Sequence, residues 1–580
     1  MRNLLPLVLF LTVITSSRAW SQAPKIDTSR GDRMIAEYFR VETEKLTARP
    51  LRDITSIKQW KEQREEHRRQ LLEMLGLDPL PERTPLKPEI TGTTEHDEFR
   101  VERLHFQSRP GLYVTGNLYV PKEIDKPLPA ILYVCGHGRV AKNGVSYGNK
   151  VHYHHHGSWF ARNGYVCLTI DTLQLGEIEG IHHGTYREGM WWWLNRGYTP
   201  AGVEAWNCVR ALDYLETRTE VDASRFGVTG RSGGGAYSWW IAAIDERIKC
   251  AVPVAGITDL ENHVVDGCVE GHCDCMYMVN TYRWDYPMVA ALVAPRPLLI
   301  SNTDTDGIFP LDGVYRTFTS VRDVYRLYGA ADKLALNITA GGHQDTQELR
   351  VHAFRWLNHH LKEDDSLIKK PAEKFFEPEE LKVFADLPDD QINSKIHETF
   401  VPAATAKLPE DKQQWNEMRD DWMNSLREKS FAAWPEGQPF FKAKEVFGAT
   451  RKGIRLSAYD FTSQPGIELR LYVATSAEGK RPELVVLNVL DDEGWREFLA
   501  TMRPAFEAEF KEETLPEADQ KSFEQTQQMF ENFSWAMAYV APRGVGPTAW
   551  NQSERKQIQH QRRFYLLGQT LEGMQAWDVR

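Results

Sequence analysis

Five compact apolar runs occur in the first two thirds of the chain. Each has the length of a strand and carries few polar residues, as expected for strands buried on both faces of a parallel sheet. They lie at 130–135, 165–170, 226–229, 297–302 and 334–339. Helix-forming segments follow two of them, at 236–243 and 346–361. Strands that alternate with helices predict an α/β domain, which we place at 95–362.

The segments on either side of this domain have different patterns. Residues 60–75 place apolar side chains at helical spacing and end before Gly76, so residues 24–94 are predicted to form a helical arm. After the domain, a stretch rich in proline and charge predicts a linker with helices over 363–450.

Residues 451–580 repeat the hydrophobic pattern of the first half of the α/β domain. Residues 453–473 alternate polar and apolar side chains as residues 99–120 do, and Gly573-Met-Gln-Ala-Trp577 repeats Gly202-Val-Glu-Ala-Trp206. This similarity predicts a second, incomplete domain of the same kind, and a chance likeness between two α/β segments is the alternative. Since Arg580 follows soon after Trp577, we expect this copy to hold no catalytic residues and to expose an unpaired strand edge.

A glycine-rich turn follows the run at 226–229. It contains Gly230-Arg-Ser232-Gly-Gly234 and leads into the helix-forming segment 236–243. Such a serine fits a nucleophile elbow, because the tight turn leaves no room for side chains two residues to either side. Ser232 is therefore the candidate nucleophile. The alternative is a glycine-rich turn with a solvated serine.

A serine nucleophile needs a base and a carboxylate that orients the base, and both follow in the expected order. Asp304 and Asp306 come after the run at 297–302, and His343 lies in a Gly-Gly-His turn after the run at 334–339. These strand ends are predicted to meet Ser232 at one edge of the sheet. The alternatives are turn caps for the aspartates and an ordinary surface position for the histidine.

The tetrahedral intermediate of acyl transfer needs backbone N–H donors. Gly233, directly after the serine, is expected to supply one. Gly138 or Arg139, after the run at 130–135, is expected to supply the other. His137 and Arg231 are predicted to line the substrate pocket.

A run of aromatic residues at 190–193 is predicted to cover the same pocket. No amphipathic element can bury all of these side chains, so the run is interpreted as part of an insertion over the active site. Trp191 and Trp192 would then stack on sugar rings or on an acyl group. A large aromatic core is the alternative.

These landmarks resemble the α/β-hydrolase superfamily, and within it the acetyl xylan esterase and prolyl-oligopeptidase-like branch. The resemblance covers residues 95–362 and rests on the Cys135-Gly-His-Gly138 loop, Ser232, Asp306 and His343. It implies an eight-stranded, mostly parallel sheet with helices on both faces. It also implies ester hydrolysis, with carbohydrate acyl groups as a substrate class.

The resemblance favours Asp306 over Asp304 as the triad acid, because the spacing from Asp306 to Pro310 matches a turn of related hydrolases. Arg231 departs from the branch, whose peptidases commonly have a bulky or aromatic residue before the serine. Glucuronoyl esterases are similar in organisation but have a different turn around the nucleophile.

Composition limits the partners and the compartment. Asp and Glu (81) outnumber Lys and Arg (70) and no basic block occurs, so nucleic acid is not an expected partner. Residues 1–23 combine Arg2, an apolar core and a small-residue end, which predicts a signal peptide and a secreted or periplasmic protein. No apolar run reaches the length that spans a bilayer, so no membrane span is expected.

Cysteine and histidine clusters raise the question of a metal. The seven cysteines lie between 135 and 275, and an odd number leaves at least one outside any disulfide. Zinc is one interpretation of the cluster at 268–275, but Cys273-x-Cys275 is tighter than the usual spacing of zinc ligands. A disulfide from Cys268, or simple packing, is favoured. The histidines at 152–156 are expected in a polar loop, and no metal and no cofactor are predicted.

The sequence therefore favours a secreted serine hydrolase that cleaves carboxylic esters, with acetyl groups on carbohydrate as the expected substrates. Its partner would be a small-molecule or polysaccharide ester. Two alternatives remain open. One is a serine peptidase of the prolyl-oligopeptidase-like type, and the other is a catalytically silent carbohydrate-binding or scaffold protein.

Overall fold

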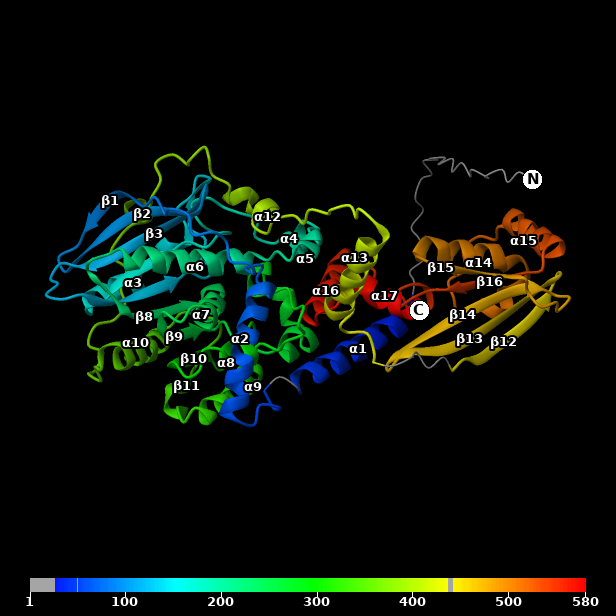
Figure 1. Ribbon diagram of the computed structural model, residues 1–580, viewed down its shortest axis with the longest axis horizontal. Coiled ribbons are helices and arrows are strands. Elements are labelled where there is room, and N and C mark those ends of the chain that lie inside the picture. The colour runs from blue at the N-terminus through cyan, green and yellow to red at the C-terminus, as the bar shows by residue number, and fades with distance from the viewer. Residues whose placement is uncertain (1–26, 49–50, 437–441) are drawn as a thin grey trace. The chain divides into compact units, whose positions relative to one another are not determined.

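The computed structural model describes residues 27–48, 51–436 and 442–580 (Figure 1). The predicted signal peptide, 1–23, lies outside the described residues. The chain forms two compact units. The larger contains Met34–Phe440, Ser463–Ile467 and Asn551–Arg580, and the smaller contains Phe441–Thr462 and Glu468–Trp550 with the residues up to Arg33. In the described part of the chain, no helix has the length and apolar character needed to cross a membrane.

The larger unit is built on a nine-stranded sheet with the order β1-β2-β3-β7-β4-β8-β9-β10-β11. The pairs β1–β2, β2–β3 and β3–β7 are antiparallel, and all pairs from β7 to β11 are parallel. The strands are β1 (Glu89–Glu95), β2 (Phe99–Arg109), β3 (Leu112–Pro121), β4 (Leu128–Val134), β7 (Val166–Ile170), β8 (Val221–Arg231), β9 (Ile248–Val254), β10 (Leu298–Thr303) and β11 (Leu334–Thr339).

The predicted fold class is confirmed, and the strand count is corrected from eight to nine. The additional strand is β1, which pairs with β2 at the edge of the sheet. Its side chains are mostly exposed, so it lacks the apolar run by which buried strands are found in a sequence.

Helices cover both faces of this sheet (Figure 1). On one face α3 packs against α10, and Trp159 stacks on Phe354 with ring centroids 3.6 Å apart. The other face carries α6, α7 and α9, with α2 beside α7 and α9. These helices are α2 (Ile57–Met74), α3 (His154–Arg162), α6 (Pro200–Glu216), α7 (Gly233–Ile244), α9 (Leu311–Leu327) and α10 (Gln347–Lys362). The sheet is thus held between two helical layers.

Further helices complete the larger unit. They are α4 (Gly184–Arg187), α5 (Trp192–Arg196), α8 (Pro287–Ala291), α11 (Pro378–Leu381), α12 (Ile396–Thr399), α13 (Lys412–Ser425), α16 (Glu554–Leu566) and α17 (Leu571–Val579). Arg562 of α16 is 1% exposed and donates to the carbonyl oxygens of Val269 and His272, each at 2.8 Å. Because α16 is buried in this way, residues 551–580 belong to the larger unit and not to the predicted domain at 451–580.

The smaller unit holds a five-stranded sheet with the order β12-β13-β14-β16-β15. Its strands are β12 (Lys444–Arg451), β13 (Ile454–Gln464), β14 (Ile467–Ser476), β15 (Leu484–Val489) and β16 (Trp535–Val540), and its helices are α14 (Asp492–Phe506) and α15 (Gln520–Asn532). β14 pairs antiparallel with β16, and β16 pairs parallel with β15. The same order and directions relate β1, β2, β3, β7 and β4. A second sheet-rich domain is therefore present, as expected from the repeat.

Candidate active site

Ser232 lies in a sharp turn between β8 and α7. Its backbone has φ 60° and ψ −121°, a conformation that residues with a side chain rarely adopt. The Ser232 N–H donates to the carbonyl oxygen of Val254 at 2.9 Å. A Cβ at Gly230 or Gly234 would lie 2.2 or 2.0 Å from the carbonyl oxygen of Val134, so only glycine fits at these two places. The turn thereby presents the serine side chain at the carboxyl end of the sheet.

The His343 ring bridges Ser232 and Asp306. Its Nε2 is 3.0 Å from Ser232 Oγ, and its Nδ1 is 2.7 Å from Asp306 Oδ2. The three side chains come from the loops after β8, β11 and β10. A hydroxyl, an imidazole and a carboxylate in this order can move the serine proton to the ring during attack on a carbonyl.

The Asp306 carboxylate is held on both oxygens. Its side chain is fully buried, and Oδ1 accepts hydrogen bonds from the N–H groups of Ile308 at 2.8 Å and Phe309 at 3.0 Å. Burial alone would raise the pKa of Asp306, but the hydrogen bonds from His343 and from the two backbone groups outweigh it and lower the pKa. The group therefore stays ionised beside the imidazole.

Asp304 occupies a different position. It is exposed, and its Oδ1 accepts the Gly341 N–H at 2.9 Å. This contact ties the loop after β10 to the loop after β11, which carries His343. Asp304 thus holds the loops together, while Asp306 contacts the ring.

Gly233 stands at the predicted oxyanion position. It is the first residue of α7, where backbone N–H groups have no acceptor inside the helix. The ring of His137 lies directly over it, because a Cβ at Gly233 would be 2.7 Å from His137 Cε1. The loop after β4 is therefore packed against the nucleophile turn.

The structure distinguishes Gly138 from Arg139, the two candidates for the second oxyanion donor. The N–H of Gly138 donates to the carbonyl oxygen of Gly136 at 2.9 Å, so the structure does not leave that group free. The Arg139 side chain turns outward and binds both carboxylate oxygens of Glu179, at 2.9 and 3.1 Å. Its backbone N–H stays the candidate for the second donor.

A cavity of about 360 Å³ opens beside Ser232. His137 and Arg231 line it, as predicted for the substrate pocket. The sequence analysis missed most of the other walls, because they come from segments without a periodic pattern. The remaining lining residues are Tyr153, His182, His183, Gly271, His272, Cys273, Met276, Ile308, Phe309 and His343.

Trp191 and Trp192 do not line this cavity. Trp192 begins α5, is 40% exposed and has its ring 6.0 Å from that of His397. Trp193 is the buried member of the run, with its ring 4.9 Å from that of Tyr198. The aromatic run packs around α5, whose later residues line another cavity.

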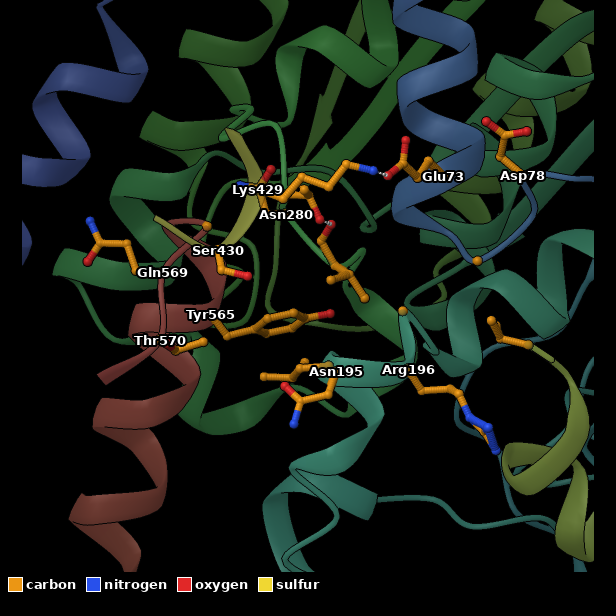
Figure 2. A pocket seen from close by; sticks show the side chains of 17 residues that line it. Glu73, Asp78, Asn195, Arg196, Asn280, Lys429, Ser430, Tyr565, Gln569 and Thr570 are labelled. Atoms are coloured by element: carbon orange, nitrogen blue, oxygen red, sulfur yellow. Dashed lines mark hydrogen bonds and ion pairs between the residues drawn. The ribbon is translucent and has the colours of Figure 1, made fainter. Parts of the chain in front are cut away.

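That other cavity, of about 370 Å³, shares no lining residue with the Ser232 cavity (Figure 2). Polar side chains form part of its wall, with an ion pair between Glu73 and Lys429 and with Asn195, Tyr565 and Thr570 around it. The two cavities have nearly the same volume, so volume does not identify the active site. In the Ser232 cavity a serine hydroxyl lies 3.0 Å from an imidazole nitrogen, which is the pair that nucleophilic catalysis needs.

Arg231 precedes the nucleophile and carries an unusual feature. Its Nε and Nη2 atoms are buried, and neither has a hydrogen-bond partner among the described residues. Buried donor atoms without an acceptor are unfavourable.

His154, His155 and His156 begin a helix and His152 lies in the turn before it, so these histidines do not form the expected polar loop. α3 starts at His154, and the Nε2 atoms of His155 and His156 each lie 3.0 Å from Oδ2 of Asp345. Burial lowers the pKa of His155 to about 3. Asp345 follows His343 closely in the chain, so these neutral rings help to fix the loop that carries the base.

The disulfide pattern also differs from the expectation. Cys273 is bonded to Cys275, and Cys268 is free. Cys268 opens a separate short 3-10 turn, Cys268–Gly271, before the bonded pair. Cys273 lines the Ser232 cavity.

Comparison with known proteins agrees with this geometry. Residues 151–363 match the prolyl oligopeptidase family. The hydrolase YtaP of Bacillus subtilis (strain 168) is 29% identical over 299 residues, which are 51% of this chain and 98% of YtaP. This part of the chain is an α/β-hydrolase domain.

Other similarities to the hydrolase domain are more distant. The carbohydrate esterase MZ0003, from an unknown prokaryotic organism, is 26% identical over 134 residues, which are 20% of this chain and 31% of that protein. The solved structure of methylesterase BT1017 has 21% identity and a TM-score of 0.45, and the match covers 69% of this chain and 82% of that chain.

Proposed function

We propose that this chain is a secreted serine hydrolase that cleaves carboxylic esters, with acyl groups on carbohydrate as its substrates. The observation that carries the proposal is the continuous hydrogen-bonded path from Ser232 Oγ through His343 to Asp306. Secretion rests on the leader pattern at 1–23.

The reaction follows from the contacts. His343 Nε2 accepts the proton of Ser232 as Oγ attacks the ester carbonyl, and Asp306 stabilises the charged ring through Nδ1–H. The oxyanion faces the Gly233 N–H at the start of α7. His343 then protonates the departing alcohol, and a water molecule activated by the same ring releases the acyl group from Ser232.

Two observations support a charged carbohydrate ester as the substrate class. The similarity to the carbohydrate esterase MZ0003 supports a sugar substrate. Arg231 lines the cavity, and its positive charge favours an ester that places a negative group there, such as an ester within an acidic polysaccharide.

Ester hydrolysis by the full-length protein tests the proposal. The rate on a short-chain chromogenic ester is expected to fall by about 10³-fold or more in Ser232→Ala. The exposed Ser224→Ala serves as the matched control and should keep the wild-type rate. Arg231→Gln should raise KM for an acidic polysaccharide ester much more than for a neutral one. A Ser232→Ala variant within tenfold of wild type would contradict the assignment.

The match to the prolyl oligopeptidase family favours a serine peptidase as the second candidate. Peptide amides with proline before the cleaved bond distinguish the two candidates. Turnover of these amides, lost in Ser232→Ala, with no turnover of carbohydrate esters would support the peptidase.

A further inference from the structure

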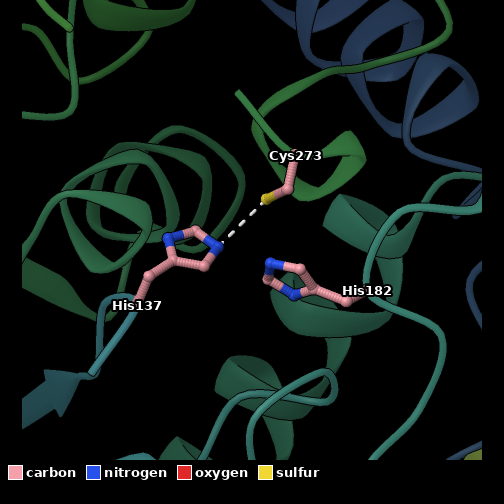
Figure 3. A group of neighbouring side chains, drawn as sticks. All are labelled: His137, His182 and Cys273. Atoms are coloured by element: carbon pink, nitrogen blue, oxygen red, sulfur yellow. Dashed lines mark hydrogen bonds between the residues drawn. The ribbon is translucent and has the colours of Figure 1, made fainter. Parts of the chain in front are cut away.

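Three side chains of the kinds that bind metals meet at the wall of the Ser232 cavity (Figure 3). His137 follows β4, His182 lies just before α4, and Cys273 lies between the short turns Cys268–Gly271 and Asp274–Met276. A ring nitrogen of each histidine and the sulfur of Cys273 all lie within 4.8 Å of one another. All three residues line the cavity.

The distances suit one tetrahedral zinc ion. With Zn–N of about 2.0–2.1 Å and Zn–S of about 2.3 Å, a nitrogen and a sulfur on one ion lie about 3.5 Å apart. The Nε2 of His137 is 3.1 Å from Cys273 Sγ, and Figure 3 shows the His182 ring turned toward both. Small side-chain rotations would bring the three atoms to ligand spacing. The cavity side leaves a fourth position for water.

The disulfide blocks this site, because a bonded sulfur is not a thiolate. A dithiol reductant gives two electrons and two protons to the Cys273–Cys275 bond, which yields two thiols, and the dithiol itself becomes a disulfide. Zinc binding then releases the proton of the Cys273 thiol. A small reductant reaches Cys273 through the cavity that this residue lines.

We propose that reduction of the Cys273–Cys275 disulfide creates a zinc site from His137, His182 and Cys273, and that zinc bound there inhibits the enzyme. The zinc ion would inhibit because of where it binds. His137 lies on Gly233, so an ion on its Nε2 occupies the space beside Ser232 that the substrate needs. The inhibition rests on the proposed function, whereas the zinc binding does not.

The zinc content of the full-length protein tests the binding. Chelator-treated protein is oxidised, or reduced with a phosphine, then mixed with zinc sulfate and desalted, and its zinc is measured by mass spectrometry. Oxidised wild type should retain almost none and reduced wild type about one ion per chain. Cys275→Ser should retain about one ion without a reductant, because it leaves Cys273 as a free thiol.

Matched variants isolate the ligands. Cys273→Ser and His182→Gln should retain no zinc in either state, while Cys268→Ser, which removes a free cysteine outside the cluster, should behave as wild type. His182→Gln leaves the disulfide intact, so it decides the question if the cysteine variants misfold. The proposal is overturned if reduced wild type binds no zinc, or if His182→Gln binds as much as wild type.

These experiments distinguish a failure of zinc binding from a failure of the proposed esterase activity. One equivalent of zinc should lower ester hydrolysis by Cys275→Ser at least about tenfold, and a chelator should restore it. Ser232→Ala should still bind zinc when reduced. If the chain is no esterase, the zinc contents stand unchanged; if zinc binds without inhibition, the proposed blockage of the cavity is wrong.

Discussion

Replacing Asp306 with asparagine tests whether its carboxylate sets the tautomer of His343. One oxygen of Asp306 accepts N–H bonds from Ile308 and Phe309, at 2.8 and 3.0 Å, and the other accepts from His343 Nδ1 at 2.7 Å. In Asp306→Asn the amide oxygen is needed by the two backbone donors, so the NH₂ group faces Nδ1. His343 then carries its proton on Nε2 and cannot accept the proton of Ser232.

The size of the effect follows from the cost of the opposite amide orientation. Turning the amide would restore the active tautomer, but it would leave two buried N–H donors without an acceptor, at about 1–3 kcal/mol each. That cost of about 2–6 kcal/mol leaves only about one molecule in 30 to one in 3 × 10⁴ with a competent histidine. We expect kcat to fall by about 10³–10⁴-fold, the size found for a triad held in the wrong tautomer.

The assay is kcat and KM on a short-chain chromogenic ester near neutral pH. Asp304→Asn is the matched control, because its amide oxygen can still accept the single bond from the Gly341 N–H. Its rate should stay within about twofold of wild type. The reasoning is refuted if Asp306→Asn keeps a tenth of the activity, or if Asp304→Asn loses as much.

Three further changes test two buried or ion-paired carboxyl groups of the larger unit and the exposed strand edge of the smaller sheet. Burial raises the pKa of Glu204 to about 8, so folding favours the protonated carboxyl group. The stability that this group contributes is complete below its unfolded pKa of about 4.3 and is lost as the pH rises through 8. Glu204→Gln should therefore gain free energy of unfolding over wild type between about pH 5 and about pH 9 in urea denaturation, and the exposed Glu188→Gln should not. Asp345→Asn should lower the free energy of unfolding at neutral pH by about 3–5 kcal/mol, because the buried guanidinium of Arg350 loses its carboxylate; a loss below 1 kcal/mol would contradict this. Val485→Lys on the exposed edge strand β15 should reduce concentration-dependent light scattering while changing stability by no more than about 0.5 kcal/mol, and unchanged scattering would count against an adhesive edge.

Five of the six strands in the parallel part of the sheet, all except β9, could be predicted, because burial leaves such strands little freedom of composition. The five apolar runs fall on β4, β7, β8, β10 and β11, since a strand covered by helices on both faces is mostly apolar. The candidates Ser232, Asp306 and His343 followed from their places just after such strands. Parallel strands bring their carboxyl ends to one edge, so order along the chain is enough to expect that they meet.

The cavity walls could not be predicted in the same way. His182 and Cys273 lie in irregular segments far apart in the chain, and only the fold brings them together. Trp191 and Trp192 were predicted to lie over the site because no amphipathic element can bury the whole aromatic run, yet the short helix α5 gives the run its own packing. Position within irregular segments depends on tertiary contacts that no periodicity records.

The smaller sheet repeats five strands of the larger sheet and, among the described residues, has no counterpart of β8, β10 and β11. β15 holds the place of β4, and in the described part of the chain it pairs with β16 alone, so Leu484, Val485 and Leu487 are 45%, 62% and 50% exposed. In the larger sheet the strand beyond that edge is β8, which ends just before Ser232, and the loops after β10 and β11 carry Asp306 and His343. All three loops of the proposed triad thus lie on the side of the sheet that the five repeated strands do not build. The strand order can therefore recur without the triad residues, because the hydrophobic pattern that forms β12 to β16 is independent of those loops.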